Sequence, residues 1–243
     1  VVGWQYRLIR RTVARLRATN LTVRANNQRI AEQSERLATL LREVHHRVKN
    51  NLAIVASLLR LQANRLPDPE AARAVRDSQQ RIEAMSLLHQ GLYQTDDVTA
   101  VDMRRYVADL VQSLSAAYSY TTADFDLTLD VVALQLNVDV AVPLGLLLNE
   151  LITNAFKHVM GPPGSARVAL RVTIGPTPDG GLLLEVQDNG PGFDPDAVRH
   201  SNSFGQRLIT ALTGQLGGQL ALEVTKGTHY RLRLPAAVLT STA

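Results

Sequence analysis

Cysteine is absent from the 243-residue sequence, and tryptophan occurs only once. Without cysteine the chain has no disulfide framework, no thiolate nucleophile and no Cys-type zinc site, which agrees with a reducing compartment and makes the cytoplasm the expected location. No uninterrupted apolar run reaches the roughly 18 residues that a membrane-spanning helix needs. The composition, 45% apolar and 20% charged, is that of a chain that buries a core.

Positive charge is concentrated at the N-terminus. Residues 1–36 hold eight arginines against Glu32 and Glu35, a net charge of +6, whereas the whole chain carries +4, so the rest sums to −2. Arginines directly after Trp4 are typical of the cytoplasmic side of a membrane helix, which predicts a membrane-anchored or sensor segment ahead of residue 1 and the cytoplasmic portion of an inner-membrane protein. A basic helix face that keeps a coiled coil soluble explains them equally well. We expect no nucleic-acid partner, and DNA binding through residues 1–36 ranks last among the rival hypotheses.

Apolar residues from Ile9 to Val48 repeat in alternating steps of four and three, which is the heptad spacing of a coiled coil. Buried Asn at an a position favours a parallel two-stranded coil in fixed register and lowers its stability. The sequence therefore predicts a marginal dimeric helix that is able to switch, although an inert dimerisation stalk fits the same pattern. The d positions are all apolar (Ile9, Leu16, Val23, Ile30, Leu37 and Val44), whereas three successive a positions are polar (Asn20, Asn27 and Ser34).

The helical pattern continues until Pro67 and Pro69 end it. A second amphipathic pattern follows and ends near Gly91. Two long antiparallel helices joined by a tight turn form a hairpin, and two copies brought together by the coil form a four-helix bundle. We therefore predict a juxtamembrane coiled-coil helix over residues 1–40 and a dimerisation hairpin over residues 41–97.

From residue 98 onward, helical patterns alternate with strands that are mostly joined as hairpins. This order predicts an α+β sandwich, one sheet covered on one face by helices, as a separate domain over residues 98–243. The expected helices are 103–118, 140–159 and 205–216, and the expected strands are 125–129, 168–174, 182–186, 220–224 and 230–234.

Polar residues gather on one face of the helix expected over 140–159, where Glu150, Asn154 and Lys157 follow at helical spacing. Carboxylate, amide and ammonium groups together can hold a magnesium ion, orient a water or hydroxyl and neutralise phosphate charge. A solvated polar face is the commoner explanation of such a pattern alone.

Asp188 ends an apolar strand and is followed by Gly190 and Gly192. An acceptor at a strand end can take a hydrogen bond from an adenine amino group, and glycines allow the backbone to approach a ligand closely. By itself the pattern is also that of a plain Asp-Asn-Gly turn. Gly205 opens a further helix, whose free amide groups can contact phosphate oxygens.

In this order and spacing the three stretches, followed by a Gly227-Thr228 pair, resemble the Bergerat-type ATP-binding domain of histidine kinases, gyrase and the mismatch-repair ATPases. The resemblance implies that ATP and Mg²⁺ are bound and that residues 193–204 form the ATP lid. It also implies that Asn154 ligates magnesium, Glu150 occupies the polarising position, Lys157 faces phosphate, Asp188 reads adenine and Thr228 supports the adenine end.

Residues 45–52 read His-His-Arg-Val-Lys-Asn-Asn-Leu, which matches the phosphoacceptor box of the second dimerisation family of histidine kinases at eight of eight positions. In the heptad, His45 occupies an e position beside the seam and His46 an f position facing solvent, so a phosphoryl group can reach His46. A neutral imidazole is a competent nucleophile. Glu43 is a candidate for orienting it, and Asn50 for holding a water that dephosphorylates a partner aspartate.

These residues predict the cytoplasmic region of a homodimeric sensor histidine kinase, which autophosphorylates on His46 and passes the phosphoryl group to an aspartate of a response-regulator receiver domain. The alternative within the family is a response-regulator phosphatase or phosphotransfer hub with weak autokinase activity, because Ser203 stands where kinase lids commonly have glycine. A binding module that uses ATP only as a structural ligand is the rival from another class.

Overall fold

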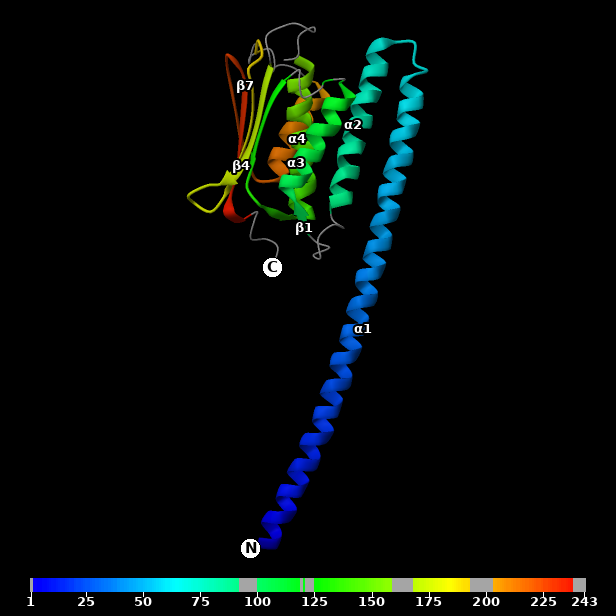
Figure 1. Ribbon diagram of the computed structural model, residues 1–243, viewed down its shortest axis with the longest axis vertical. Helices are drawn as coiled ribbons and strands as arrows, with labels where there is room; N and C mark the ends of the chain where they lie inside the picture. The colour runs from blue at the N-terminus through cyan, green and yellow to red at the C-terminus, as the bar shows by residue number, and fades with distance from the viewer. Residues whose placement is uncertain are drawn as a thin grey trace. The chain divides into compact units, whose positions relative to one another are not determined.

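The chain divides into two units, residues 1–46 and 47–243. The structure, a computed structural model, describes residues 2–91, 100–118, 120, 125–158, 168–192 and 203–237. The boundary between the units falls inside one long helix, α1 (Val2–Ala63) (Figure 1).

The N-terminal unit is helical over its whole described length, as the heptad pattern predicts. The three polar a residues are exposed, and so are the apolar d residues whose side chains the structure describes. An apolar stripe that stays exposed on a long helix is typical of a surface that another helix covers. The d residues that the structure describes range from 48% to 67% accessible: Leu16, Val23, Ile30, Leu37 and Val44.

The C-terminal unit begins with the last turns of α1 and with α2 (Pro69–Gly91). The predicted stop at the prolines is confirmed, because α1 ends before them. The Asp68 carboxylate caps α2 by accepting hydrogen bonds from the backbone N–H groups of Glu70 and Ala71 at 3.1 and 3.2 Å. Pro69 occupies the first helical position, where its missing N–H is not needed. Residues 92–97 of the expected hairpin lie outside the described residues.

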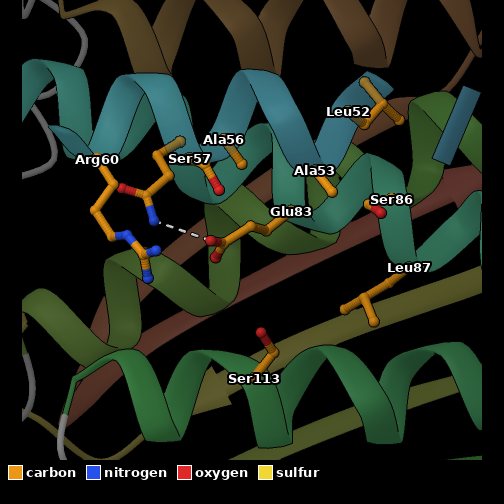
Figure 2. Close-up of a pocket in the computed structure, with 10 residues that line it drawn as sticks. Leu52, Ala53, Ala56, Ser57, Arg60, Glu83, Ser86, Leu87 and Ser113 are labelled. Carbon is orange, nitrogen blue, oxygen red and sulfur yellow. Dashed lines mark hydrogen bonds between the residues drawn. The ribbon is translucent and has the colours of Figure 1, made fainter. Parts of the chain in front are cut away.

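A hollow of about 340 Å³ lies where α1 and α2 meet α3 (Met103–Ala117) (Figure 2). Its lining includes Ala56 of α1, Leu87 of α2 and Ser113 of α3. Nearby turns of α1 expose four further apolar side chains, so the hairpin presents a surface that a second copy would cover in a four-helix bundle. These side chains are Ile54, Val55, Leu58 and Leu61.

A five-stranded mixed sheet forms one layer of the C-terminal unit, with the order β2-β4-β5-β7-β6. Strands β2 and β4 are parallel, and the other neighbours are antiparallel. The parallel pair needs a crossover, which α4 (Val138–His158) supplies. The strands are β2 (Phe125–Val131), β4 (Val168–Pro176), β5 (Leu182–Asp188), β6 (Gln219–Thr225) and β7 (Gly227–Leu234).

Helices α3, α4 and α6 (Phe204–Gln215) cover one face of the sheet (Figure 1). Leu184 and Val186 of β5 alternate inward, and Leu148 and Ile152 of α4 are fully buried in the same core. The predicted α+β sandwich is therefore confirmed. By length and composition α4 passes as a membrane span, but 78% of its apolar window is buried inside the protein, as expected of a core helix.

The sequence did not reveal a second, two-stranded sheet formed by β1 (Ala100–Asp102) and β3 (Gln135–Asn137). Strands of three residues are too short to show a period of two, which is why the pattern missed them.

The predicted domain boundaries at residues 40/41 and 97/98 stay predictions. Ala84 and Leu88 of α2 are buried in the same core as the sheet.

Candidate functional site

Asp188, at the end of β5, is the best-supported residue of the expected nucleotide site. Its side chain is largely buried, with 7% of the residue accessible. The carboxylate oxygen Oδ1 accepts hydrogen bonds from the backbone N–H groups of Gly190 and Thr228, at 2.9 and 3.0 Å. These bonds fix the carboxylate between the two strand ends. Asp188, Gly190 and Thr228, which the sequence selected separately, are thus brought together.

Two glycines permit the close packing of this cluster. Gly227 has a φ of 107°, and a Cβ there would lie 2.0 Å from the carbonyl oxygen of Asp188. Gly192 has a φ of 68°, and a Cβ there would lie 2.6 Å from Cγ1 of Val224. Both positions therefore exclude a side chain, for reasons of backbone conformation and of space.

Tyr230 of β7 is hydrogen-bonded to Asn154 of α4 and lies near the charge of Asp188. The pKa of Tyr230 is raised to about 12, because burial and the negative charge of Asp188 raise it by more than a hydrogen bond with Asn154 lowers it. The sequence analysis missed Tyr230, because its place among the alternating buried residues of β7 predicts an ordinary core residue. In the structure Tyr230 bonds to one predicted site residue and lies within the electrostatic influence of another.

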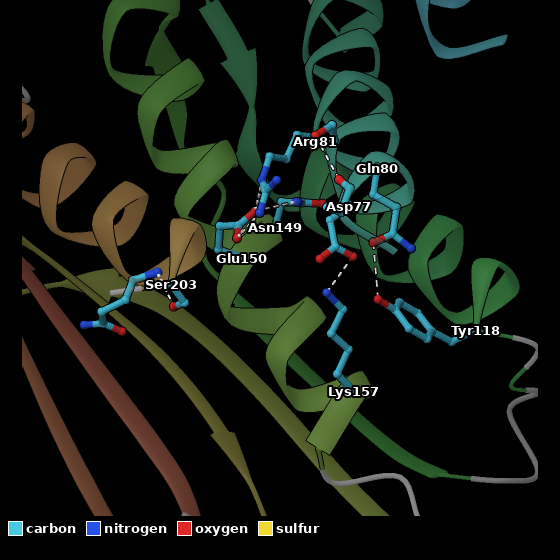
Figure 3. Close-up of polar contacts among 11 residues, drawn as sticks. Asp77, Gln80, Arg81, Tyr118, Asn149, Glu150, Lys157 and Ser203 are labelled. Carbon is cyan, nitrogen blue, oxygen red and sulfur yellow. Dashed lines mark hydrogen bonds and ion pairs between the residues drawn. The ribbon is translucent and has the colours of Figure 1, made fainter. Parts of the chain in front are cut away.

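Glu150 of α4 is held by an arginine from α2 (Figure 3). Arg81 donates from Nε to Oε1 at 2.7 Å and from Nη2 to Oε2 at 2.9 Å. The side chains of Arg81 and Glu150 are only 16% and 5% accessible. Asn149 adds a long contact of 3.4 Å from Nδ2 to Oε1. Both oxygens of the predicted polarising carboxylate are therefore bound by a residue that the sequence did not suggest.

Lys157, the predicted phosphate contact, is also held by α2. Its Nζ lies 2.6 Å from Oδ1 of Asp77 (Figure 3). Close by, the Tyr118 hydroxyl donates to Oε1 of Gln80 at 3.2 Å. Burial raises the pKa of Tyr118, and the nearby charges of Asp77 and Glu150 raise it further. Asp77, Gln80 and Arg81 thus form a polar face of α2 against the ATP-binding domain.

Gly205 lies beside Glu150 at the start of α6, since a Cβ there would be 3.1 Å from Oε2 of Glu150. Ser203 caps this helix by accepting a hydrogen bond from the N–H of Gln206 at 3.4 Å. The Arg81 guanidinium lies 4.6 Å from the ring centroid of Phe204. The expected ATP lid lies outside the described residues except for Ser203 and Phe204.

The predicted phosphoacceptor residues are accessible. His46 and Glu43 are exposed in the N-terminal unit, and Asn50 is exposed in the C-terminal unit. The prediction that His46 faces solvent is therefore confirmed. The side chain of His45 lies outside the described residues.

The chemistry of the cluster fits a nucleotide. Since both bonds to Asp188 go to Oδ1, its Oδ2 accepts nothing from the described residues and suits an amino-group donor. No group of three or more His, Asp or Glu side chains that could hold a metal occurs among those residues. Mg²⁺ at nucleotide sites takes one or two protein ligands together with phosphates and waters, and the amide oxygen of Asn154 suits that role.

Comparison with known proteins agrees with this geometry. Residues 43–118 match the protein family described as histidine kinase, and residues 139–238 match the family described as histidine kinase-, DNA gyrase B- and HSP90-like ATPase. The chain belongs to the histidine kinases. It contains both regions of such a kinase, and ATP binding and signal transduction are the functions that follow from the two matched families.

Named relatives agree with this assignment. The sensor histidine kinase PdtaS of Mycobacterium tuberculosis is 31% identical over 202 residues, which cover 80% of this chain and 39% of PdtaS. Blue-light-activated histidine kinase 2 of Erythrobacter litoralis is 27% identical over 199 residues, which cover 81% of this chain and 56% of that protein. The chain therefore spans about two fifths of the length of PdtaS.

The fold has a solved counterpart. The histidine kinase domain of a blue-light-activated histidine kinase from Erythrobacter litoralis matches with a TM-score of 0.60 at 23% sequence identity. The match covers 83% of this chain and 93% of that chain. This likeness confirms the fold, a helical region followed by an α/β sheet domain.

Proposed function

We propose that the chain transfers the γ-phosphoryl group of ATP to His46 and then to an aspartate of a response-regulator receiver domain. The observation that carries the proposal is that one chain combines an exposed His46, within a complete phosphoacceptor motif, with the buried, backbone-bonded Asp188 of a nucleotide-binding fold. In the first step the bond from phosphorus to the ADP oxygen breaks as a bond to an imidazole nitrogen forms. In the second step that bond breaks as the carboxylate oxygen attacks phosphorus.

The chain's residues act mainly by positioning and by charge neutralisation, which is what phosphoryl transfer requires. Asp188 accepts the adenine amino group through Oδ2, and Thr228 holds the carboxylate in place. Asn154 binds Mg²⁺, whose charge offsets that of the phosphates when it is bound, and Lys157 contacts phosphate. Glu43 is the proposed orienting group for His46, and Glu150 the polarising one.

The protein is proposed to work as a homodimer. The exposed d residues of α1 and the exposed apolar residues of the hairpin both support this, because each surface is the kind that a second helix covers. A sensor or membrane-anchored segment preceding residue 1 would then deliver the signal through the coil. The cytoplasm is the proposed compartment.

Mass-spectrometric mapping after incubation with Mg-ATP tests the proposal. We expect acid-labile phosphate on His46 and none on His46→Ala, whereas the neighbouring His45→Ala variant keeps its label. Asp188→Asn should lose both nucleotide binding and label. A wild-type protein that binds ATP and never labels any histidine would contradict the proposal and favour a binding module.

One observation favours a second function, that of a response-regulator phosphatase with weak autokinase activity. Glu150 and Lys157, the two residues expected to serve the phosphates, are paired with Arg81 and Asp77 of α2. If this function dominates, a phosphorylated receiver domain loses its phosphate faster with the protein present, and Asn50→Ala removes that acceleration.

A further inference from the structure

Helix α2 contacts α4 through two ion pairs, and each helix contributes one acidic and one basic residue. Asp77 and Arg81 are four residues apart on α2, and Glu150 and Lys157 are seven apart on α4. Both spacings place the paired residues on one face of their helix. The contacts are Lys157 to Asp77 at 2.6 Å and Arg81 to Glu150 at 2.7 Å.

Arg81 is the centre of this arrangement. It bonds both oxygens of Glu150 in α4, and its guanidinium lies over the ring of Phe204, the first residue of α6. Because the guanidinium and the carboxylate are largely withdrawn from solvent, salt screens their attraction less than that of a surface pair. Arg81 therefore joins α2 to two elements of the ATP-binding domain at once.

The other end of α2 is attached by apolar packing. Leu88 and Ala84 are each 1% accessible. A Cβ added to Gly145 of α4 would lie 2.7 Å from Cδ1 of Leu88, so the glycine permits a close approach of the two helices. Added phosphate charge acts on the charged end of α2 and has little effect on this apolar end. The middle of α2, which is held by charge, can therefore separate from α4 while the apolar C-terminal part stays packed as a pivot.

We propose that Asp77 and Arg81 form a nucleotide-sensitive latch that holds the kinase in an inactive state. The latch occupies two residues of the proposed function, on which this inference rests: Lys157, which is assigned to phosphate, and Glu150, which is assigned to the polarising position. Mg-ATP phosphates compete with Asp77 for Lys157, so nucleotide binding weakens the latch. By linkage the latch weakens nucleotide binding by the same factor.

Two substitutions with opposite charge effects test the latch in the full chain. Asp77→Asn and Arg81→Gln should each tighten binding of a fluorescent ATP analogue by about threefold to tenfold and raise the initial rate of His46 labelling, because the binding-competent fraction grows. A simple charge effect predicts the opposite sign for Arg81→Gln, since that change removes a positive charge near the phosphates. Weaker or unchanged binding in a folded Arg81→Gln protein would overturn the latch. If Arg81→Gln does not fold, the affinity of Asp77→Asn for the same ATP analogue decides, and unchanged or weaker binding again overturns the latch.

Asp109→Asn is the matched control. Asp109 pairs with Arg105 at 3.9 Å within α3, and both side chains are at least half accessible. The variant loses an aspartate and an ion pair without touching α2, so its nucleotide affinity should equal that of the wild type. An equal gain in nucleotide affinity in Asp109→Asn would show that the loss of a negative charge alone explains the tighter binding of Asp77→Asn.

Hydrogen exchange separates the latch from the proposed function. Adding a non-hydrolysable Mg-ATP analogue should speed amide exchange around residues 76–82 and leave exchange around residues 84–90 unchanged. If that difference appears while His46 is never labelled, the latch stands and the kinase proposal fails. If His46 is labelled but exchange of the two segments does not respond to nucleotide, the kinase proposal stands and the latch is rejected.

Discussion

The N-terminal part of α1 and helix α4 are both long helices with apolar residues at helical spacing, and their surroundings are opposite. Leu37 of α1 is 60% accessible, whereas Leu148 of α4 is 0% accessible. The α4 residues are covered by the sheet and by neighbouring helices of the same chain. An apolar stripe alone therefore does not indicate whether its partner lies in the same chain.

The two helices obtain their stability from different sources. The free energy that folds α4 comes from burial within the chain, so it does not depend on protein concentration. The coil of α1 gains such burial only when a second helix covers it, so its stability depends on concentration.

The largest effect is expected in α4. Leu148→Ala should lower the free energy of unfolding by about 2–5 kcal/mol, because it removes buried methyl groups and leaves a cavity. The same change at Leu21, which is 67% accessible, should alter it by about 0.5 kcal/mol or less. Urea unfolding at low protein concentration compares the two. Equal losses of unfolding free energy would mean that Leu21 is buried within its own chain, and would contradict the contrast between α1 and α4.

A single methyl group should also disturb the nucleotide site. Gly227→Ala forces a Cβ against Asp188 at a φ of 107°, and the backbone conformation alone should cost about 1–3 kcal/mol. We expect nucleotide binding, followed by titration calorimetry, to weaken along with stability. Gly214→Ala is the control: nothing lies within 4 Å of its Cβ position in α6, and the change should stabilise that helix by roughly 0.5–1 kcal/mol.

The coil is expected to respond through dimer affinity. Leu37→Asn places an amide at a d position and should weaken dimerisation by about 1–3 kcal/mol, as measured by analytical ultracentrifugation over a concentration series. Leu21→Asn, which lies outside the a and d positions, should leave the dimer unchanged. If both variants behave alike, the heptad assignment is wrong.

The smallest effect per substitution is expected at the polar a positions. Replacing Asn20, Asn27 and Ser34 by Ile or Val should strengthen the dimer by about tenfold or less per position and fix kinase output at one level. Labelling of His46 in the presence and absence of the input signal measures that output. A signal response that survives the triple substitution contradicts a switching role for the coil.

Much of the fold was predictable because its patterns are local. The heptads of α1, the stop at the prolines and the inward alternation of β5 each depend on residues a few positions apart. The short strands β1 and β3 were missed because three residues show no period. Tyr230 was missed because a buried tyrosine in a strand has the same pattern whether or not it bonds to a site residue.

An eight-residue motif around His46 and the order of the polar stretches at Glu150, Asp188 and Gly205 were enough to identify the family. The groups that these residues contact became known from the folded structure. Glu150 and Lys157 contact Arg81 and Asp77, which are 69 and 80 positions away in the chain. The reason is physical: spacing along the chain fixes the face of a helix, but the packing of Leu88 against Gly145 fixes which faces come together.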